Sequence, residues 1–316
     1  MLKNPRFATA FLILVLSLIL PMFLDEFFLT ILVQMLMWAY LAMAWDVIGG
    51  YGGQFSLGHA AFLGLGAYTS TLLLENYGIS PWLGMFASGA IAAIAGAFVG
   101  FASLRLRGPF FALGTIAFAE LTQLLLTYLK DVTGGPLGIM INRTGIEYML
   151  FEKQLHYYYL ILAFVIFGTL FLRYFENSKF GMALMALRED EDAAESIGIN
   201  VYRSKVLGAT ISAFLTGLGG TFYAQWIHYI RPDTIVRLDF SVQMAAIDVV
   251  GGAGSPYGGI IGALILVPIS LYLNAIFGGM IAGLSTVLYG IILLVVVVTM
   301  PGGIYGIIRR RFPAGR

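Results

Sequence analysis

Three acidic residues, Asp46, Glu120 and Asp248, lie in or beside long apolar stretches of the sequence. A charged side chain at membrane depth is costly, so it faces protein, water or a second charge, and in transporters such groups serve ion pathways, relays or gates. Glu120 is deepest in its stretch, so we expect it to face the interior of a helical bundle. Structural pairing or an interfacial position is the alternative for all three.

Two glycine-rich breaks interrupt the apolar pattern, at residues 49–59 and 251–259. Broken helices at membrane depth are tolerated where they face protein or a water-filled cavity, and in transporters they often mark the path of the substrate. Tight cytoplasmic turns, in which glycine permits unusual backbone angles, would explain the same breaks. The candidate residues of a translocation path are Gln54, Ser56, His59, Glu120 and Asp248.

A polar connection at residues 176–205 carries a cluster of five acids beside apolar residues at near-helical spacing. The pattern predicts a short amphipathic helix over residues 182–198, ended by Gly198. Its acidic face would be repelled by anionic lipid, so docking into a groove of another protein is favoured over docking on the membrane. A solvated loop helix is the alternative.

Other chemistry is excluded by what the sequence lacks. It has no cysteine, and its three histidines are far apart without a carboxylate at metal-ligand spacing, so neither a thiol nucleophile nor a metal site is predicted. It has no Gly-x-Ser-x-Gly or His-Glu-x-x-His motif, which argues against an enzyme. It also lacks a Gly-x-x-x-x-Gly-Lys-Ser/Thr loop, so ATP would have to be used by a separate chain.

The composition requires lipid as the solvent for much of the chain, because 59% of the 316 residues are apolar and 11% are charged. We therefore predict an all-α polytopic bundle that forms one transmembrane permease domain over residues 1–316, with a cytoplasmic coupling loop at 176–205. The first apolar run has no small-x-small cleavage pattern after it and is predicted to be retained. The predicted spans are residues 7–24, 27–48, 60–75, 82–104, 110–129, 157–175, 206–228, 239–250, 260–277 and 280–300.

The basic residues indicate the orientation. With the N-terminus in the cytoplasm, thirteen of the eighteen Lys and Arg residues lie inside and five lie outside, which favours both termini inside. Residues 239–250 must then cross to keep the parity, as a short or discontinuous helix, and this gives about ten crossings. Glycines four residues apart, as at Gly96 and Gly100, Gly258 and Gly262, and Gly279 and Gly283, predict close helix packing.

Several segments together resemble one family. Asp192-Ala193-Ala194-x-x-x-Gly198 is similar to the Glu-Ala-Ala-x-x-x-Gly signature in the coupling loop of bacterial ABC-importer permeases, with Asp in place of Glu. Other blocks resemble the branched-chain amino-acid ABC transporter permease family, in particular its LivM-type subunit. These blocks are Gly53–Phe62 with Gly66-Ala67-Tyr68, Gly108–Leu113 with Ala117–Glu120, Thr133–Ile139, Leu187–Val201, and Gly251–Ser255 with Gly262-Ala263. Residues 140–156 match no block.

The resemblance implies a permease in the bacterial inner membrane that imports branched-chain amino acids by alternating access. It implies as partners a second, LivH-type permease, two cytoplasmic ATP-binding subunits and an extracytoplasmic binding protein, and no cofactor in this chain. Contact with the ATPase would fall on the coupling loop, at Arg188, Glu189, Asp190, Glu191, Asp192, Ala193, Ala194 and Gly198. Nucleic acid is not an expected partner, since the net charge is +1.

Two alternatives stay open. Asp46, Glu120 and Asp248 could couple transport to ions in a secondary transporter or channel, although the acidic loop argues against this. Within the ABC class, relatives that carry urea, short amides or sugars share the scaffold, and substrate choice rests largely with the binding protein.

Overall fold

The computed structural model describes residues 12, 15–102, 106, 108–279, 283–300 and 302–311. The longer helices are α2 (Glu26–Asp46), α3 (His59–Tyr77), α4 (Pro81–Ala102), α5 (Pro109–Tyr128), α7 (Gln154–Glu176), α8 (Lys179–Glu189), α10 (Val201–Ile227), α12 (Leu238–Gly251), α13 (Gly258–Phe277), α14 (Leu284–Thr299) and α15 (Gly303–Arg311). Short elements connect them: η1 (Leu20–Phe23), the π-helical η2 (Val47–Tyr51), α6 (Lys130–Thr133), η4 (Gly135–Leu137), β1 (Ile139–Met140), η5 (Ile146–Tyr148), α9 (Glu191–Ser196), β2 (Tyr229–Ile230) and α11 (Pro232–Ile235).

The predicted class, a helical polytopic membrane protein, is confirmed. Among the described residues, seven segments are long and apolar enough to cross a membrane: residues 26–51, 81–102, 109–128, 154–176, 201–227, 258–277 and 284–307. The predicted count of ten is not confirmed. α3 is not among the seven, and the predicted span 7–24 lies largely outside the described residues.

The short run predicted at 239–250 forms α12, whose 14 residues reach about 21 Å at 1.5 Å per residue. A bilayer core is about 30 Å thick, so α12 alone is too short to span it. A glycine-rich turn separates α12 from α13, as the sequence predicts for a discontinuous helix.

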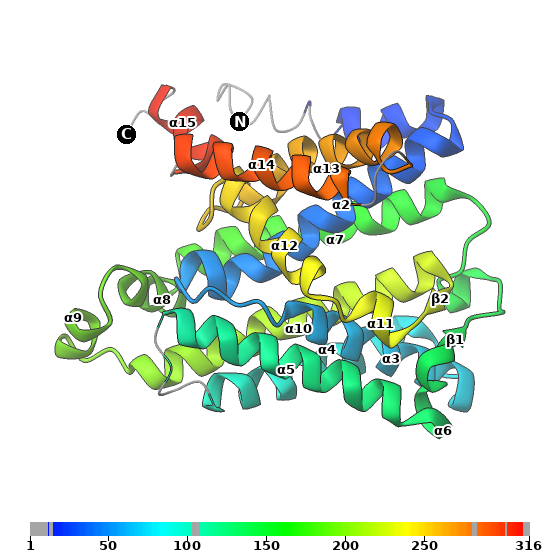
Figure 1. Ribbon diagram of the computed structural model, residues 1–316, viewed down its shortest axis with the longest axis horizontal. Coiled ribbons are helices and arrows are strands. Elements are labelled where there is room, and N and C mark those ends of the chain that lie inside the picture. Colours follow the sequence, from blue (N-terminus) through cyan, green and yellow to red (C-terminus); the bar gives the residue numbers. More distant parts are fainter. Residues whose placement is uncertain are drawn as a thin grey trace.

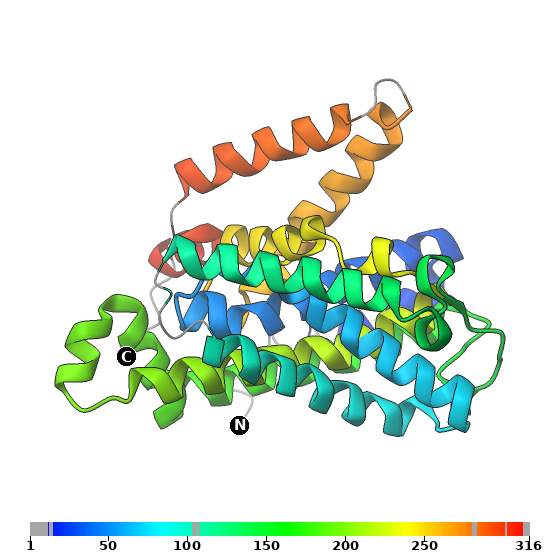
Figure 2. The ribbon, with the colours of Figure 1, turned by 60° about the horizontal axis from the view of Figure 1, so that its bottom comes forward.

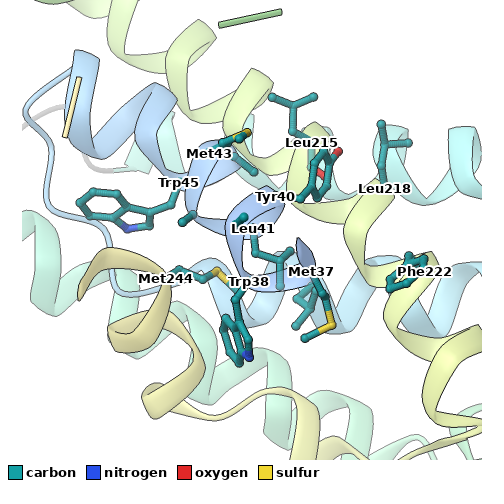
Figure 3. Close-up of a cluster of buried hydrophobic side chains, with 14 of the residues drawn as sticks. Met37, Trp38, Tyr40, Leu41, Met43, Trp45, Leu215, Leu218, Phe222 and Met244 are labelled. Atoms are coloured by element: carbon teal, nitrogen blue, oxygen red, sulfur yellow. The ribbon is translucent and has the colours of Figure 1, made fainter. Parts of the chain in front are cut away.

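Helix α2 runs through the middle of the bundle and is buried on every side from Met37 to Ile48. Its side chains pack against α7, α10, α12 and α13, and Figure 3 shows those of Tyr40, Leu41 and Trp45 among residues of α10 and α12. The Tyr40 hydroxyl donates to the Leu215 carbonyl oxygen at 2.9 Å, which satisfies its buried polar atom. A helix that is apolar all round is expected at such a central position.

Helices α3, α4 and α10 approach one another through small residues. A Cβ atom added to Gly217 would lie 2.7 Å from the Ala92 Cβ atom and 2.8 Å from the Ser88 carbonyl oxygen. Gly96 and Gly100 face α10 in the same way, as predicted, and Gly258 and Gly262 face α12. The third predicted pair differs, because nothing lies within 4 Å of a Cβ atom added at Gly279 or Gly283.

The polar connections gather at opposite ends of the bundle. Helices α8 and α9 lie at one end, and β1, β2 and α6 lie at the other (Figure 1). The two strands pair antiparallel, with Ile139 opposite Ile230. The first half of α13 packs against α2 and α12, whereas Figure 2 shows the second half of α13 and α14 standing away from the other helices. Only Ser285 of α14 is buried.

Candidate functional site

The predicted coupling helix is two helices, α8 and α9, that meet at Asp190. The Asp190 backbone is extended (φ −160°, ψ 118°), and its carboxylate accepts a hydrogen bond from the Ala193 amide at 2.9 Å. An Asp at this position caps the second helix and ends the first, because Asp competes well for free amides at a helix start. The prediction of one continuous helix over 182–198 is therefore wrong. Gly198, at φ +89°, ends α9 as predicted.

The base of this α8–α9 unit is anchored to the bundle by apolar side chains. Leu184, Leu187 and Ala194 are at most 2% exposed. Ala194 therefore does not belong to the exposed face, although the motif resemblance included it in the coupling surface. These contacts make α8–α9 a packed extension of the bundle rather than a free loop.

Two polar contacts strengthen the anchor. Arg188 donates to the Gly50 carbonyl oxygen at 2.7 Å, and thereby joins α8 to the first glycine-rich break. The Glu191 carboxylate accepts from the Gln54 side-chain amide at 3.1 Å and forms an ion pair with Lys205 at 2.5 Å. Lys205 is only 7% exposed, so this pair ties α9 to α10 in a largely desolvated place. No local pattern predicts the role of Lys205, because it lies fourteen residues from Glu191.

The outer face of α8–α9 is acidic with apolar residues at its edges. Glu189, Asp192 and Ala193 are exposed there. Met182 is 51% exposed and Ile197 is 75% exposed. Large exposed apolar side chains beside charges are typical of a surface that binds another protein.

The two glycine-rich breaks meet at the base of α8. The Gly254 amide, in the second break, donates to Asp46 Oδ1 at 2.6 Å, just before the first break. Arg188 also approaches the second break, with 3.5 Å between its guanidinium and the Ala253 carbonyl oxygen. Asp46 and Asp248 are fully buried here, and their carboxyl groups lie within hydrogen-bonding reach of each other. The sequence left structural pairing open for both residues, but no local pattern identifies the partner across the 202 positions that separate them.

His59 belongs to a buried relay that fastens three segments. Its Nδ1 atom lies 3.0 Å from Ser56 Oγ, and its Nε2 atom lies 2.7 Å from Ser212 Oγ. Ser212 donates its own proton to the Ala44 carbonyl oxygen at 2.6 Å, so it must accept from His59 Nε2–H. His59 is then a neutral ring whose Nδ1 accepts from Ser56. The relay holds the first glycine break against α2 and α10.

Glu120 lies on the open face of α5, so the prediction that it faces the bundle interior is wrong. The buried face of α5 carries Phe111, Thr115, Ala119, Thr122 and Leu126, and Glu120 falls on the opposite side. It lines a surface cavity of about 360 Å³ with Gln123, Val236, Arg237, Leu238 and Asp239. Three of its six lining residues are charged, and two of these, Arg237 and Asp239, form an ion pair at 2.9 Å.

The five candidate path residues thus lie in four different surroundings. Gln54 binds the coupling unit, Ser56 and His59 share the relay, Asp248 pairs with Asp46, and Glu120 is exposed. Their role in a path stays a prediction.

Residues 140–156, which match no family block, form the surface of the opposite end. Ile141 and Leu150 are buried, and the Phe151 amide donates a hydrogen bond to the Tyr157 hydroxyl oxygen at 3.0 Å. A cavity of about 390 Å³ opens here, lined by Thr144, Gly145, Ile146, Leu150, Phe151, Glu152, Lys153 and His156. The segment is therefore folded onto the bundle, with a concave polar surface facing outward.

Comparison with known proteins agrees with the motifs. A family model described as the permease component of branched-chain amino acid transport systems matches residues 27–297. The high-affinity branched-chain amino acid transport permease LivM of Escherichia coli is 31% identical over 279 residues, which cover 81% of this chain and 65% of that protein. LivM of Salmonella typhimurium is 30% identical over 279 residues, which again cover 81% of this chain and 65% of that protein. The match therefore spans slightly less than two thirds of these two relatives.

A relative whose name states a different substrate also matches. The nucleoside ABC transporter permease NupC of Lactococcus lactis is 24% identical over 257 residues, which cover 75% of this chain and 78% of that protein. No solved structure matches this chain. Because the family model covers most of the sequence and the LivM proteins match at about 30% identity, the chain belongs to the permease family of branched-chain amino acid transport systems.

Proposed function

We propose that this chain is one permease subunit of an ATP-driven importer that carries branched-chain amino acids across the bacterial inner membrane by alternating access. The observation that carries the proposal is the α8–α9 unit, whose base is fixed to the bundle and whose acidic, partly apolar face is exposed. The names of the LivM relatives support this substrate class.

In this proposal, a cytoplasmic ATP-binding subunit docks on α8–α9 and moves it when ATP binds. Arg188 transmits the movement to the first glycine break, and the Glu191–Lys205 pair transmits it to α10. ATP shifts the equilibrium only if it binds one of the two conformations more tightly. Two such subunits are expected, one for each permease. Helix α15 lies toward the same end as α8 and α9 (Figures 1 and 2), which supports a cytoplasmic C-terminus.

The open face of α5 supports a second, LivH-type permease as a neighbour. A carboxylate exposed to hydrocarbon costs a few kcal/mol, so Glu120 favours contact with protein or water over lipid. We place the substrate path between the two permeases, along the cavity of Glu120, Arg237 and Asp239. The folded surface of residues 140–156, at the end opposite α8–α9, would receive the extracytoplasmic binding protein.

Charge reversal on the α8–α9 face tests the proposal. The variant Glu189→Arg with Asp192→Arg should lose ATP hydrolysis that is stimulated by loaded binding protein, because two repulsive charges enter the docking face. Asp131→Arg, at an exposed acid of α6 outside residues 140–156, is the matched control and should keep the stimulation. Normal stimulated hydrolysis in the double variant would refute the docking assignment. Uptake driven by an ion gradient in vesicles without any ATPase would instead favour a secondary transporter.

Substrate choice is tested in the same reconstituted complex. Binding proteins loaded with a branched-chain amino acid, a nucleoside, urea, an amide or a sugar are compared for stimulation of hydrolysis and for uptake. Stimulation only by a solute other than an amino acid would overturn the substrate and leave the ATPase coupling intact.

A further inference from the structure

The paired aspartates lie where the end of α2, the end of α12 and the base of α8 meet. Asp46 ends α2, Asp248 lies in the last turn of α12, and both are 0% exposed. Gly50 follows Asp46 closely in the first break, and a Cβ atom there would collide with the Asp46 carboxylate. Glycine at position 50 therefore lets the first break lie directly against the Asp46 carboxylate and the Gly254 amide of the second break.

Most oxygens of the pair have no hydrogen-bond donor. Asp46 Oδ1 accepts from the Gly254 amide, but within the described part of the chain Asp46 Oδ2 and both oxygens of Asp248 have no partner. The nearby Tyr51 hydroxyl is buried and unpartnered in the same way. Buried polar atoms are almost always hydrogen-bonded. Three unpartnered carboxylate oxygens in one buried place therefore indicate that the site holds a proton to donate.

The charges at the site point to the same conclusion. The groups that face the pair are Arg188 from α8, Glu176 from the end of α7 and Tyr51, with Tyr305 of α15 close to Tyr51. Two ionised carboxylates in contact, with Glu176 nearby, would give Arg188 more negative charge than it can balance. Like charges about 3 Å apart cannot both stay ionised in a buried site.

We propose that Asp46 and Asp248 share one proton, and that this proton latches the two glycine breaks and the base of the coupling unit together. Asp46 is the ionised partner, since its Oδ1 atom accepts from the Gly254 amide. Asp248 is the neutral partner, and its O–H donates to Asp46 Oδ2. The pair then carries one negative charge, which Arg188 balances. Loss of the proton to water leaves two negative charges in contact and drives the ends of α2 and α12 apart.

The latch goes beyond the proposed function, since it requires no particular substrate and no ATPase. The sign of its pH dependence follows from linkage. In the unfolded chain both carboxyl groups lose their protons above about pH 4. The folded chain keeps one proton above that pH, so its stability falls as pH rises until the shared proton is released. The folding equilibrium changes by up to about tenfold per pH unit over this window.

Thermal unfolding of the purified full chain in detergent, from about pH 5 to about pH 8, tests the latch. The wild type should lose stability as pH rises. Asp248→Asn should remove most of this slope, because its amide donates to Asp46 without a proton to release. Asp46→Asn should do the same with the roles exchanged. Asp233→Asn, at an exposed acid of α11, is the matched control and should keep the wild-type slope.

Infrared spectroscopy gives a second readout that needs no unfolding. The wild type at neutral pH should show a protonated carboxyl band that both single variants lack. Failure of both single variants to fold would overturn the proposal, because each keeps one donor and one negative charge. A wild-type slope retained in both variants would overturn it as well. Stabilisation by Na⁺ in place of the pH slope would show that a cation, and not a proton, bridges the pair.

Discussion

The packed side of the molecule, formed by α3, α4 and α10, and its open side, formed by α14 and the outer face of α5, use the same residue types differently. Glycines of the packed side lie against backbone of a neighbouring helix, as Gly217 lies against Ser88 and Ala92. Gly290 of α14 has nothing within 4 Å of an added Cβ atom.

Polar residues divide in the same way. On the packed side, His59 and Ser212 satisfy each other and hold helices together. On the open side, Glu120 lines a cavity with Arg237 and Asp239 and has no such structural task. Small and polar residues therefore indicate helix packing only where they are buried inside this chain. Where they stay uncovered, they indicate contact with lipid, solute or another chain.

The largest effect is expected from Gly217→Ala. Its Cβ atom would lie 2.7 Å from that of Ala92, so α4 and α10 must separate, at a cost of about 1–3 kcal/mol. This outweighs the gain in helix propensity of about 1 kcal/mol. The thermal unfolding midpoint in detergent should fall. Gly290→Ala is the control on the open side and should leave the midpoint unchanged or raise it. Equal effects of the two substitutions would remove the distinction between the sides.

An intermediate loss of stability is expected from His59→Phe. The ring is retained, but Ser56 loses its acceptor and Ser212 loses a donor in a buried place, which costs about 1–3 kcal/mol. A double-mutant cycle with Ser212→Ala should show coupling of at least about 0.5 kcal/mol, because the two side chains share one hydrogen bond. His156→Phe, at an exposed histidine, should change stability by less than about 0.5 kcal/mol. Additive losses in the cycle would contradict the relay.

The packed side was the more predictable of the two. Apolar runs and four-residue glycine spacings are local signals, and they predicted most helices and the contacts of Gly96 and Gly100. The burial of Glu120 was predicted wrongly because depth in an apolar run does not say which face of the helix is covered. The spacing of Thr115, Ala119 and Thr122 held that information, since small residues mark the packed face of a membrane helix.

The base of the coupling unit was predictable only in part. The acid-rich pattern located α8–α9, but the break at Asp190 depends on one cap that competes with continuous helix. The contacts of Glu191 with Lys205 and of Asp46 with Asp248 join distant segments, and no local pattern specifies them.

The smallest effect on stability, and the sharpest test of the open side, is expected from Glu120→Gln. The side chain is exposed and does not pack between helices, so the free energy of unfolding of the isolated chain should change by less than about 0.5 kcal/mol. If the cavity with Arg237 and Asp239 lies on the substrate path, uptake by the assembled complex should nevertheless fall several-fold. The cavity would lose one of its two carboxylates, and the other, Asp239, is already paired with Arg237. Asp131→Asn, at an exposed acid of α6, should change neither quantity. A stability loss at Glu120 without an uptake defect would return this residue to a structural role, and the open face of α5 would then behave like the packed side.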